Sequence, residues 1–363
     1  MLKRLLGHSP LVTRIRGAWQ RDADVALKPL RKEIRRLSRE VEALHAELRD
    51  TSIRAARGDR YASQLRLREE IDARQQDQLA SLPTLLDESR IGRHISQAIG
   101  SATMHTDPFE HIVVEHVLPP EVYELVLAAM PPEEFFDDHD PIKRNLVLPI
   151  NFGPALARHV WNFVDGTVAA RLIRPAIVAK FHEPLQQHYD TVFGSPFRAQ
   201  ANAMPHVSGS GRLMLRRRGY HLPPHRDPKR SLLTCLLYLA RPGDSETHGT
   251  QLFRVLDDRE ASYKQTYYPE ADGARCELVT VVPFRPNTML VFLNSRGAHG
   301  ATIPADAGES VERYSYQFYV APENAALGTL IRRLPPERRV MWQNKNRLAG
   351  APSEQGREWS AAR

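Results

Sequence analysis

The stretch from Gly219 to Ala240 reads GYHLPPHRDPKRSLLTCLLYLA and joins a His-x-Asp motif to a run of apolar residues. The run from Leu232 to Ala240 is too short to cross a membrane and has the length of a buried strand. His225 and Asp227 are two residues apart, which in an extended segment puts both side chains on one face. The motif therefore presents two side chains that can bind a metal directly before a core strand.

The surrounding sequence predicts a domain in which helices come first and strands follow. Residues 108–114 have the period and β-branched content of a short strand, and Pro119 and Pro120 then open a helix. Residues 161–189 show further helical periodicity. After residue 197 the apolar segments are short and evenly spaced, as in a β-sandwich or barrel. They are residues 212–215, 231–240, 250–255, 278–282, 288–293 and 314–320. We therefore expect an α+β fold.

A second histidine, His299, follows the strand expected at residues 288–293. A His-x-Asp pair with one distant His is the ligand set of a 2-His-1-carboxylate triad, which holds Fe(II) and leaves the opposite face open. Dioxygen and a co-substrate can bind at that open face. His221 and His225 have the spacing of a helical zinc site, but the two prolines between them exclude a helix. The sequence therefore favours Fe(II) over a zinc hydrolase site.

Four blocks of this sequence resemble the Fe(II)/2-oxoglutarate-dependent oxygenases of the prolyl-4-hydroxylase-like group, and they come in that family's order. The blocks are PFEHIVVEHVLPPEVYELVLAAMP at 108–131, the stretch quoted above at 219–240, RPNTMLVFLNSRGAHG from 285 and ERYSYQFYV from 312. Together they cover most of residues 107–322. The resemblance implies a double-stranded β-helix, which is a jelly roll, with supporting helices.

The resemblance also implies which residues form the site. His225, Asp227 and His299 would be the catalytic Fe(II) ligands of a dioxygenase that uses dioxygen and 2-oxoglutarate, with ascorbate as a supporting reductant. Arg313 would bind the far carboxylate of 2-oxoglutarate, because a planar guanidinium can hold a carboxylate through two charge-assisted hydrogen bonds. Ser315 would be its companion.

Two features of this co-substrate site leave alternatives open. The segment from His299 to Arg313 is longer than the family usually shows, with residues 304–309 inserted, and Arg296 is the substitute for Arg313. Tyr220 and Tyr238 are expected to hydrogen-bond the co-substrate, or else to be half-buried aromatic residues.

Composition limits the other classes of function. The chain has 363 residues and a formal net charge of +7, but the basic residues gather near its two ends. No stripe of basic and aromatic residues runs through the middle, so we expect no nucleic-acid partner. Two cysteines cannot build a disulfide framework, which suits a reducing compartment, and no apolar run is long enough to span a membrane. We predict a cytoplasmic protein.

The N-terminal part has a different pattern. Leu30, Ile34, Leu37, Val41, Leu44 and Leu48 alternate steps of four and three, which is the heptad spacing of a coiled coil. β-Branched residues alternate with leucines in this row, a combination that favours a coiled coil of two parallel helices. We therefore predict a homodimer; the alternative is a helix that packs on its own catalytic domain.

The segment before this row is basic and amphipathic. Five cations and no acid occur in residues 1–21, between apolar residues at roughly helical spacing. Such a segment can lie in the headgroup region of an anionic membrane, which would place the protein peripherally at the inner membrane. The alternative is a frayed terminus, since Pro10 interrupts a continuous helix.

These patterns divide the chain into four parts. They are a basic segment (1–25), a helical arm (26–100) with a coiled coil at about 27–50, an oxygenase domain (101–323) whose β core covers about 197–322, and a basic tail (324–363). The expected activity is hydroxylation of an unactivated C–H bond in a glycan, lipid-linked or peptidyl substrate. The alternative is a non-catalytic jelly-roll binding or scaffolding protein that dimerises through its coiled coil.

Overall fold

The computed structural model describes residues 10–137, 140–227, 229–257, 266–268, 275–294, 296–337 and 339. Its contacts divide the chain into two compact units, residues 1–67 and 68–363. The predicted basic segment at 1–25 and the chain beyond residue 339 lie outside the residues whose side chains are described. Among the described residues, no helix combines the length and the hydropathy needed to cross a membrane.

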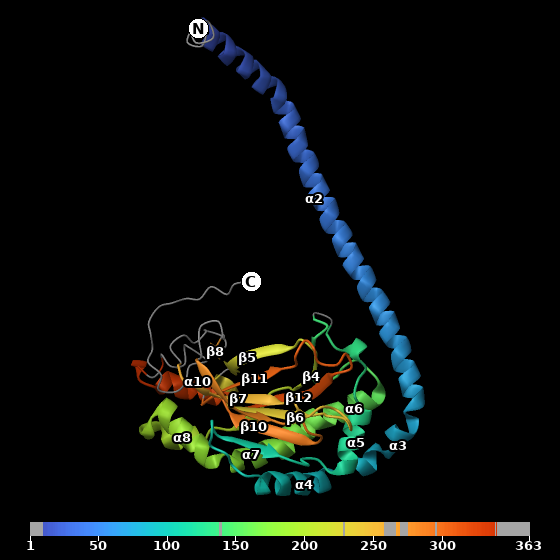
Figure 1. Ribbon diagram of the computed structural model, residues 1–363, viewed down its shortest axis with the longest axis vertical. Coiled ribbons are helices and arrows are strands. Elements are labelled where there is room, and N and C mark those ends of the chain that lie inside the picture. The colour runs from blue at the N-terminus through green and yellow to red at the C-terminus, as the bar shows by residue number, and fades with distance from the viewer. Residues whose placement is uncertain are drawn as a thin grey trace. The chain divides into compact units, whose positions relative to one another are not determined.

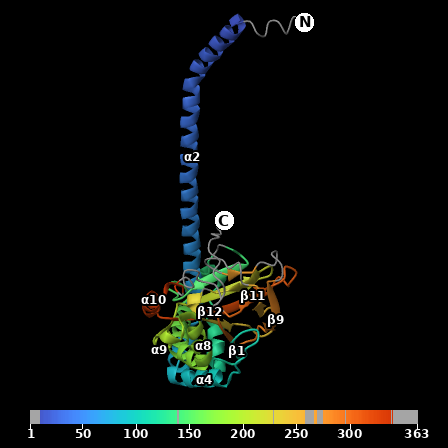
Figure 2. The ribbon, with the colours of Figure 1, turned by 90° about the vertical axis from the view of Figure 1, so that its left-hand side faces the viewer.

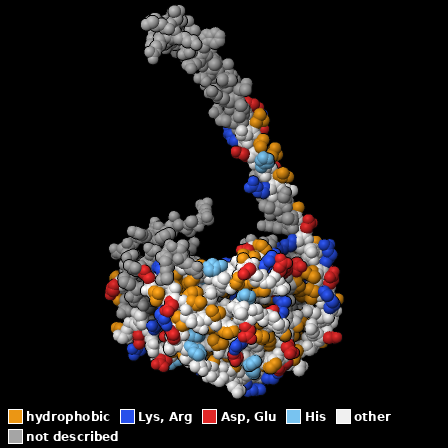
Figure 3. Space-filling model, viewed as in Figure 1, with side chains coloured by type: hydrophobic (Ala, Val, Ile, Leu, Met, Phe, Trp, Pro, Cys, Tyr) orange, Lys and Arg blue, Asp and Glu red, His pale blue; other side chains and the backbone are white. Residues whose placement is uncertain are grey.

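The first unit is helical throughout its described part. Helix α2 (Pro10–Arg74) begins at Pro10, the residue that was expected to interrupt a helix. Proline is tolerated at the first position of a helix, so Pro10 is compatible with this start. The helix continues through Gly58, because one glycine costs a helix only about 1 kcal/mol. Leu37, Val41, Leu44 and Leu48 are between 46% and 65% exposed, and Figure 3 shows apolar side chains on this surface. The pairing of this row with a second helix stays a prediction.

The second unit contains two antiparallel sheets. The seven-stranded sheet has the order β1-β10-β6-β12-β4-β2, with β3 paired to β12, and the five-stranded sheet has the order β8-β5-β11-β7-β9. The first comprises β1 (His111–Val114), β10 (Thr288–Leu293), β6 (Leu233–Tyr238), β12 (Glu312–Pro322), β4 (Arg212–Arg217), β2 (Lys143–Val147) and β3 (His206–Ser208). The second comprises β8 (Thr266–Tyr267), β5 (His221–Arg226), β11 (Ala298–Thr302), β7 (Thr250–Val255) and β9 (Cys276–Val282).

Helices cover the outer face of the large sheet. In Figure 1 the layers follow one another as small sheet, large sheet and helices, and Figure 2 again shows α4 on the side away from β11. The longer ones are α3 (Gln76–Leu85), α4 (Glu88–Ser101), α5 (Pro120–Ala128), α6 (Ala155–Phe163), the π-helix η2 (Val164–Ile173), α7 (Arg174–Lys180), α8 (His182–Phe193) and α10 (Asn324–Arg333). The helical layer and the two sheets confirm the α+β class and the sandwich expected for a jelly roll.

Strand β6 separates two cores because its successive side chains point to opposite faces. Leu233, Cys235 and Leu237 belong to the core under the helices, whereas Leu236 and Tyr238 belong to the core between the sheets. Strand β12 lies beside β6 with Ser315 opposite Tyr238. Arg313, Ser315, Gln317 and Tyr319 therefore share the face of β12 that looks toward the small sheet.

Candidate metal centre and co-substrate site

Three candidate metal ligands come together between the sheets. One nitrogen from each of His225 and His299 and one carboxylate oxygen of Asp227 lie within 4.8 Å of one another, and all three residues are buried. The Nε2 atoms of His225 and His299 are 3.9 Å and 3.6 Å from the Asp227 carboxylate oxygens. Donors about 2.1 Å from a metal and at right angles are about 3 Å apart, so a small inward movement would close this group on an ion.

The pairing of β5 with β11 brings the two histidines together. His225 and His299 are cross-strand partners, and the register shifts immediately after His299. His225 Nδ1 donates a hydrogen bond of 3.0 Å to the Pro223 carbonyl, which leaves Nε2 as the lone-pair donor. Phe292 packs against the other imidazole, with its ring centroid 4.6 Å from that of His299. Both rings are thus held with Nε2 toward the Asp227 carboxylate.

Electrostatics favours neutral imidazoles at this site. Burial lowers the pKa of His225, and burial together with the neighbouring His225 lowers the pKa of His299 to about 3. A metal binds the neutral imidazole, so at neutral pH protons compete little for these nitrogens. Two imidazoles and one carboxylate are too few to close a structural zinc site and too nitrogen-rich for Ca²⁺, but they match an open Fe(II) site.

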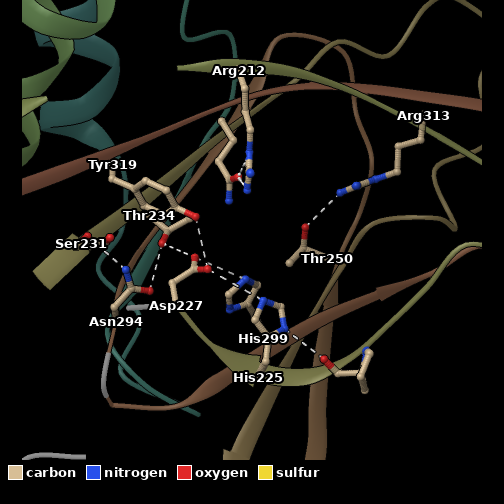
Figure 4. A network of polar contacts seen from close by, with 12 residues as sticks. Arg212, His225, Asp227, Ser231, Thr234, Thr250, Asn294, His299, Arg313 and Tyr319 are labelled. Carbon is tan, nitrogen blue, oxygen red and sulfur yellow. Dashed lines mark hydrogen bonds and ion pairs between the residues drawn. The ribbon is translucent and has the colours of Figure 1, made fainter. Parts of the chain in front are cut away.

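The Asp227 carboxylate is oriented from the large sheet (Figure 4). Thr234 Oγ1 on β6 donates to Asp227 Oδ2 at 2.7 Å, and Tyr319 on β12 donates to Oδ1 at 3.3 Å. Asn294 Oδ1 lies 3.0 Å from the same Thr234 hydroxyl, and its amide nitrogen donates to the Ser231 carbonyl. Sequence reasoning missed these three residues, because a single hydroxyl or amide within an apolar strand carries no recognisable spacing.

Arg313 forms the second polar centre of the interior. Its Nη2 donates to Thr250 Oγ1 at 3.1 Å, and Tyr238 donates to the same oxygen at 2.8 Å. The Arg313 guanidinium also lies 5.3 Å from the ring centroid of Tyr238 and 5.2 Å from that of Phe284. The guanidinium is therefore fixed by one hydroxyl and two aromatic rings, and Thr250 is a further residue that the sequence did not indicate.

Two buried polar atoms beside this centre have no partner among the described residues. They are Arg313 Nε and Ser315 Oγ. A buried polar group left unpaired costs about 1–3 kcal/mol, so such atoms mark a place for a polar ligand. An anionic ligand matches these donors, since the charged Arg313 and the hydroxyl of Ser315 lie on the same face of β12.

Tyr220 and Arg296, which were predicted for the co-substrate site, lie away from Arg313. Tyr220 packs with Ala301 and Ile303, and its ring centroid is 5.1 Å from the guanidinium of Arg216. Arg296 lies in the turn before β11, and within the described residues it makes no hydrogen bond to Tyr238 or Thr250. The structure thus brings Tyr238 and Ser315 to Arg313, but not Tyr220 or Arg296.

No protein-family model and no curated protein matches the chain. Solved structures that are similar include HygX from Streptomyces hygroscopicus with nickel and 2-oxoglutarate bound, at 15% identity and a TM-score of 0.36, covering 59% of this chain and 83% of that one. A prolyl-4-hydroxylase of Pseudomonas putida is 12% identical with a TM-score of 0.35, covering 64% and 100% of the two chains. A 2OG-Fe(II) oxygenase family oxidoreductase of Burkholderia pseudomallei is 10% identical with a TM-score of 0.35, covering 59% and 85%.

Proposed function

We propose that this protein is an Fe(II)- and 2-oxoglutarate-dependent dioxygenase that hydroxylates an unactivated C–H bond of a glycan, lipid-linked or peptidyl substrate. The observation that carries the proposal is the pair of buried centres, the His225–Asp227–His299 group and the Arg313–Thr250 pair, in one interior. A scaffolding protein would have no need for three buried metal-binding side chains that face one another.

In this proposal each residue has a defined task. His225, Asp227 and His299 hold Fe(II), and Arg313 binds the far carboxylate of 2-oxoglutarate while Ser315 offers its unpaired hydroxyl. The bound metal and co-substrate supply the oxidation, in which one atom of dioxygen enters the substrate and the other enters succinate as carbon dioxide is released.

The remaining side chains of the interior keep the site ordered and dry. Thr234 and Tyr319 hold the carboxylate of Asp227 in one orientation, which second-sphere hydrogen bonds commonly do for metal ligands. Leu236, Leu252 and Phe292 belong to the apolar core between the sheets. Their exclusion of water strengthens the charge interactions of the site.

The test is an anaerobic titration of the full chain with Fe(II) and 2-oxoglutarate, followed by the visible metal-to-ligand charge-transfer band. We expect a band only when both are present, its loss in His225→Ala, and a weaker affinity for 2-oxoglutarate in Arg313→Gln. His221→Ala is the matched control, because His221 is an exposed histidine on the same strand that contacts Thr302 instead of the triad. A folded, metal-loaded protein without the band would refute the proposal.

We also infer that α2 joins two copies of the chain through the row that contains Leu37, Val41, Leu44 and Leu48. The exposure of these four side chains supports this, because a continuous apolar row on a soluble helix is stabilised when a second helix covers it. Deletion of residues 1–60 should then convert a dimer to a monomer in light scattering.

Cytoplasmic location and contact of residues 1–25 with an anionic membrane remain proposals from the sequence. Co-sedimentation with anionic vesicles tests the contact. The full chain should bind, and a chain that begins at residue 26 should not.

A further inference from the structure

A second arginine, Arg212, reaches the interior of the roll from the face of the large sheet that also carries Arg313. Arg212 on β4 is the cross-strand partner of Gln317 on β12, and it donates through Nε at 2.8 Å, and through Nη2, to Gln317 Oε1. Figure 4 shows Arg212 pointing from its strand toward the three candidate metal ligands, while Arg313 approaches from another direction. Gln317 is buried and Arg212 is half-buried, so the pair is part of the interior wall.

The Arg212 guanidinium has donors to spare. A guanidinium carries five N–H groups, and Gln317 accepts from Nε and from one hydrogen of Nη2. Within the part of the chain that the structure describes, no acceptor contacts the two hydrogens of Nη1 or the second hydrogen of Nη2. These belong to the planar end of the group, the edge that binds two oxygens of a carboxylate or a phosphate.

Three arginines of this wall lack a carboxylate partner among the described residues. Arg212, Arg216 and Arg313 lie on β4 and β12, and within the described residues none of them forms an ion pair with a carboxylate. Arg216 instead donates to the Arg144 carbonyl and the Asn145 side chain. Burial lowers the pKa of Arg216, and the charges of Arg212 and Arg313 lower it further, although Tyr220 opposes the shift. Partly buried cations that repel one another favour the binding of anions.

The proposed co-substrate has two carboxylates, and both bind to partners other than Arg212. One binds at the metal and the other at Arg313, so neither neutralises Arg212. We propose that Arg212, held in place by Gln317, binds an oxyanion of the primary substrate, a carboxylate or a phosphate, and so positions the C–H bond over the metal. This inference rests on the proposed function and narrows its substrate class to anionic molecules.

The first test uses inorganic phosphate and acetate as probes of the two oxyanion chemistries. The full chain, loaded anaerobically with Fe(II) and 2-oxoglutarate, is titrated with each anion at constant ionic strength and followed by calorimetry. We expect saturable binding of at least one anion in the wild type and at least tenfold weaker binding in Arg212→Gln. The charge-transfer band and the affinity for 2-oxoglutarate should change less than twofold. Preference for phosphate indicates a phosphate ester, and preference for acetate indicates a carboxylate.

A second variant distinguishes a role of Arg212 in anion binding from a role in the stability of the fold. Gln317→Glu keeps the size of the side chain and gives Arg212 a permanent counter-ion. If Arg212 is an anchor, this variant loses anion binding while its melting temperature is maintained or raised. Arg218→Gln is the matched control, because Arg218 is an exposed arginine paired with Glu309, and its removal should leave anion binding unchanged.

The outcomes distinguish the two proposals. Absence of the charge-transfer band in the wild type refutes the dioxygenase. A normal band with no saturable anion binding, or with equal binding in wild type and Arg212→Gln, overturns the proposed role of Arg212. The proposed dioxygenase activity is not affected by that result. Retained anion binding in Gln317→Glu also overturns the proposed role of Arg212.

Discussion

Asp227 illustrates how much a single residue depends on its neighbours. The His-x-Asp motif and the later His299 could be predicted from sequence because the residue types that bind a metal are few and their order is informative. Thr234 and Thr250 could not, because each is one hydroxyl in an apolar strand. Their roles arise only from the register that places Thr234 near Asp227 and Thr250 near Arg313.

Replacement of Thr234 by valine should weaken the metal site. The change removes the hydroxyl that donates to Asp227 Oδ2 and keeps the shape of the side chain. Loss of such a second-sphere bond typically costs about 10–100-fold in metal affinity. Anaerobic Fe(II) titration measures this, and Thr234→Ser, which retains the hydroxyl, should stay within a few-fold of wild type. Equal affinity in the valine variant would mean that Thr234 does not orient the carboxylate.

Replacement of Thr250 by valine should affect the co-substrate and spare the metal. The variant loses the oxygen that accepts from both Arg313 and Tyr238, so the guanidinium loses its anchor. We expect the dissociation constant for 2-oxoglutarate to rise about tenfold, equivalent to about 1.4 kcal/mol, with unchanged Fe(II) affinity. Thr302→Val on β11 is the control, and a similar rise there would contradict a specific role for Thr250.

At the scale of elements, the strands that carry the metal ligands were the hardest to predict. The apolar strands β6, β10 and β12 were expected close to where they lie, whereas β5, which contains Pro223 and Pro224, was not among the expected strands. Proline cannot donate to a strand ladder. β5 tolerates the pair because its register with β11 is irregular there, between His225 and Leu222.

The contact between β7 and β9 predicts a steric effect at Gly249. A Cβ atom at Gly249 would overlap the Val282 carbonyl oxygen of the neighbouring strand. Gly249→Ala must therefore push the strands apart, and we expect a loss of about 1–3 kcal/mol in the free energy of unfolding. Thr250 is the next residue, so 2-oxoglutarate affinity should fall too. Urea denaturation measures the first effect.

Gly308→Ala is the control for this prediction. The nearest heavy atom to its added Cβ would be Val311 Cγ2 at 3.9 Å, an ordinary contact. Its unfolding free energy should stay within about 0.5 kcal/mol of wild type. A Gly249→Ala protein as stable as this control would show that β7 and β9 can separate at little cost.

At the scale of the whole molecule, the helical nature of the N-terminal part could be predicted, but its partner could not. A heptad row records which face of a helix is apolar, and it does not state what covers that face. The four exposed apolar residues of α2 offer the surface that a second helix would cover.

The double substitution Leu37→Glu and Leu44→Glu should abolish dimers formed through α2. Both residues occupy positions in the apolar row, and opposed carboxylates would repel each other across a seam. Light scattering coupled to size exclusion should give the mass of a dimer for wild type and of a monomer for the variant. Glu42→Gln, outside the row, should remain dimeric. A monomeric wild type would contradict the prediction directly.

The position of β12 in the sequence determines when the large sheet can form during synthesis of the chain. This strand pairs with β4, β6 and β3, which all precede it in the chain, so the centre of the large sheet can form only after these neighbours have been synthesised. At about 5–20 residues per second, roughly 4–17 seconds pass between the synthesis of Tyr238, the last residue of β6, and that of Pro322, the last residue of β12. During that time the edges of β4 and β6 that pair with β12 lack this partner. A premature stop before Glu312 would remove the middle of the sheet and leave both edges without a partner, so we expect the nascent chain to need chaperones until β12 has been made.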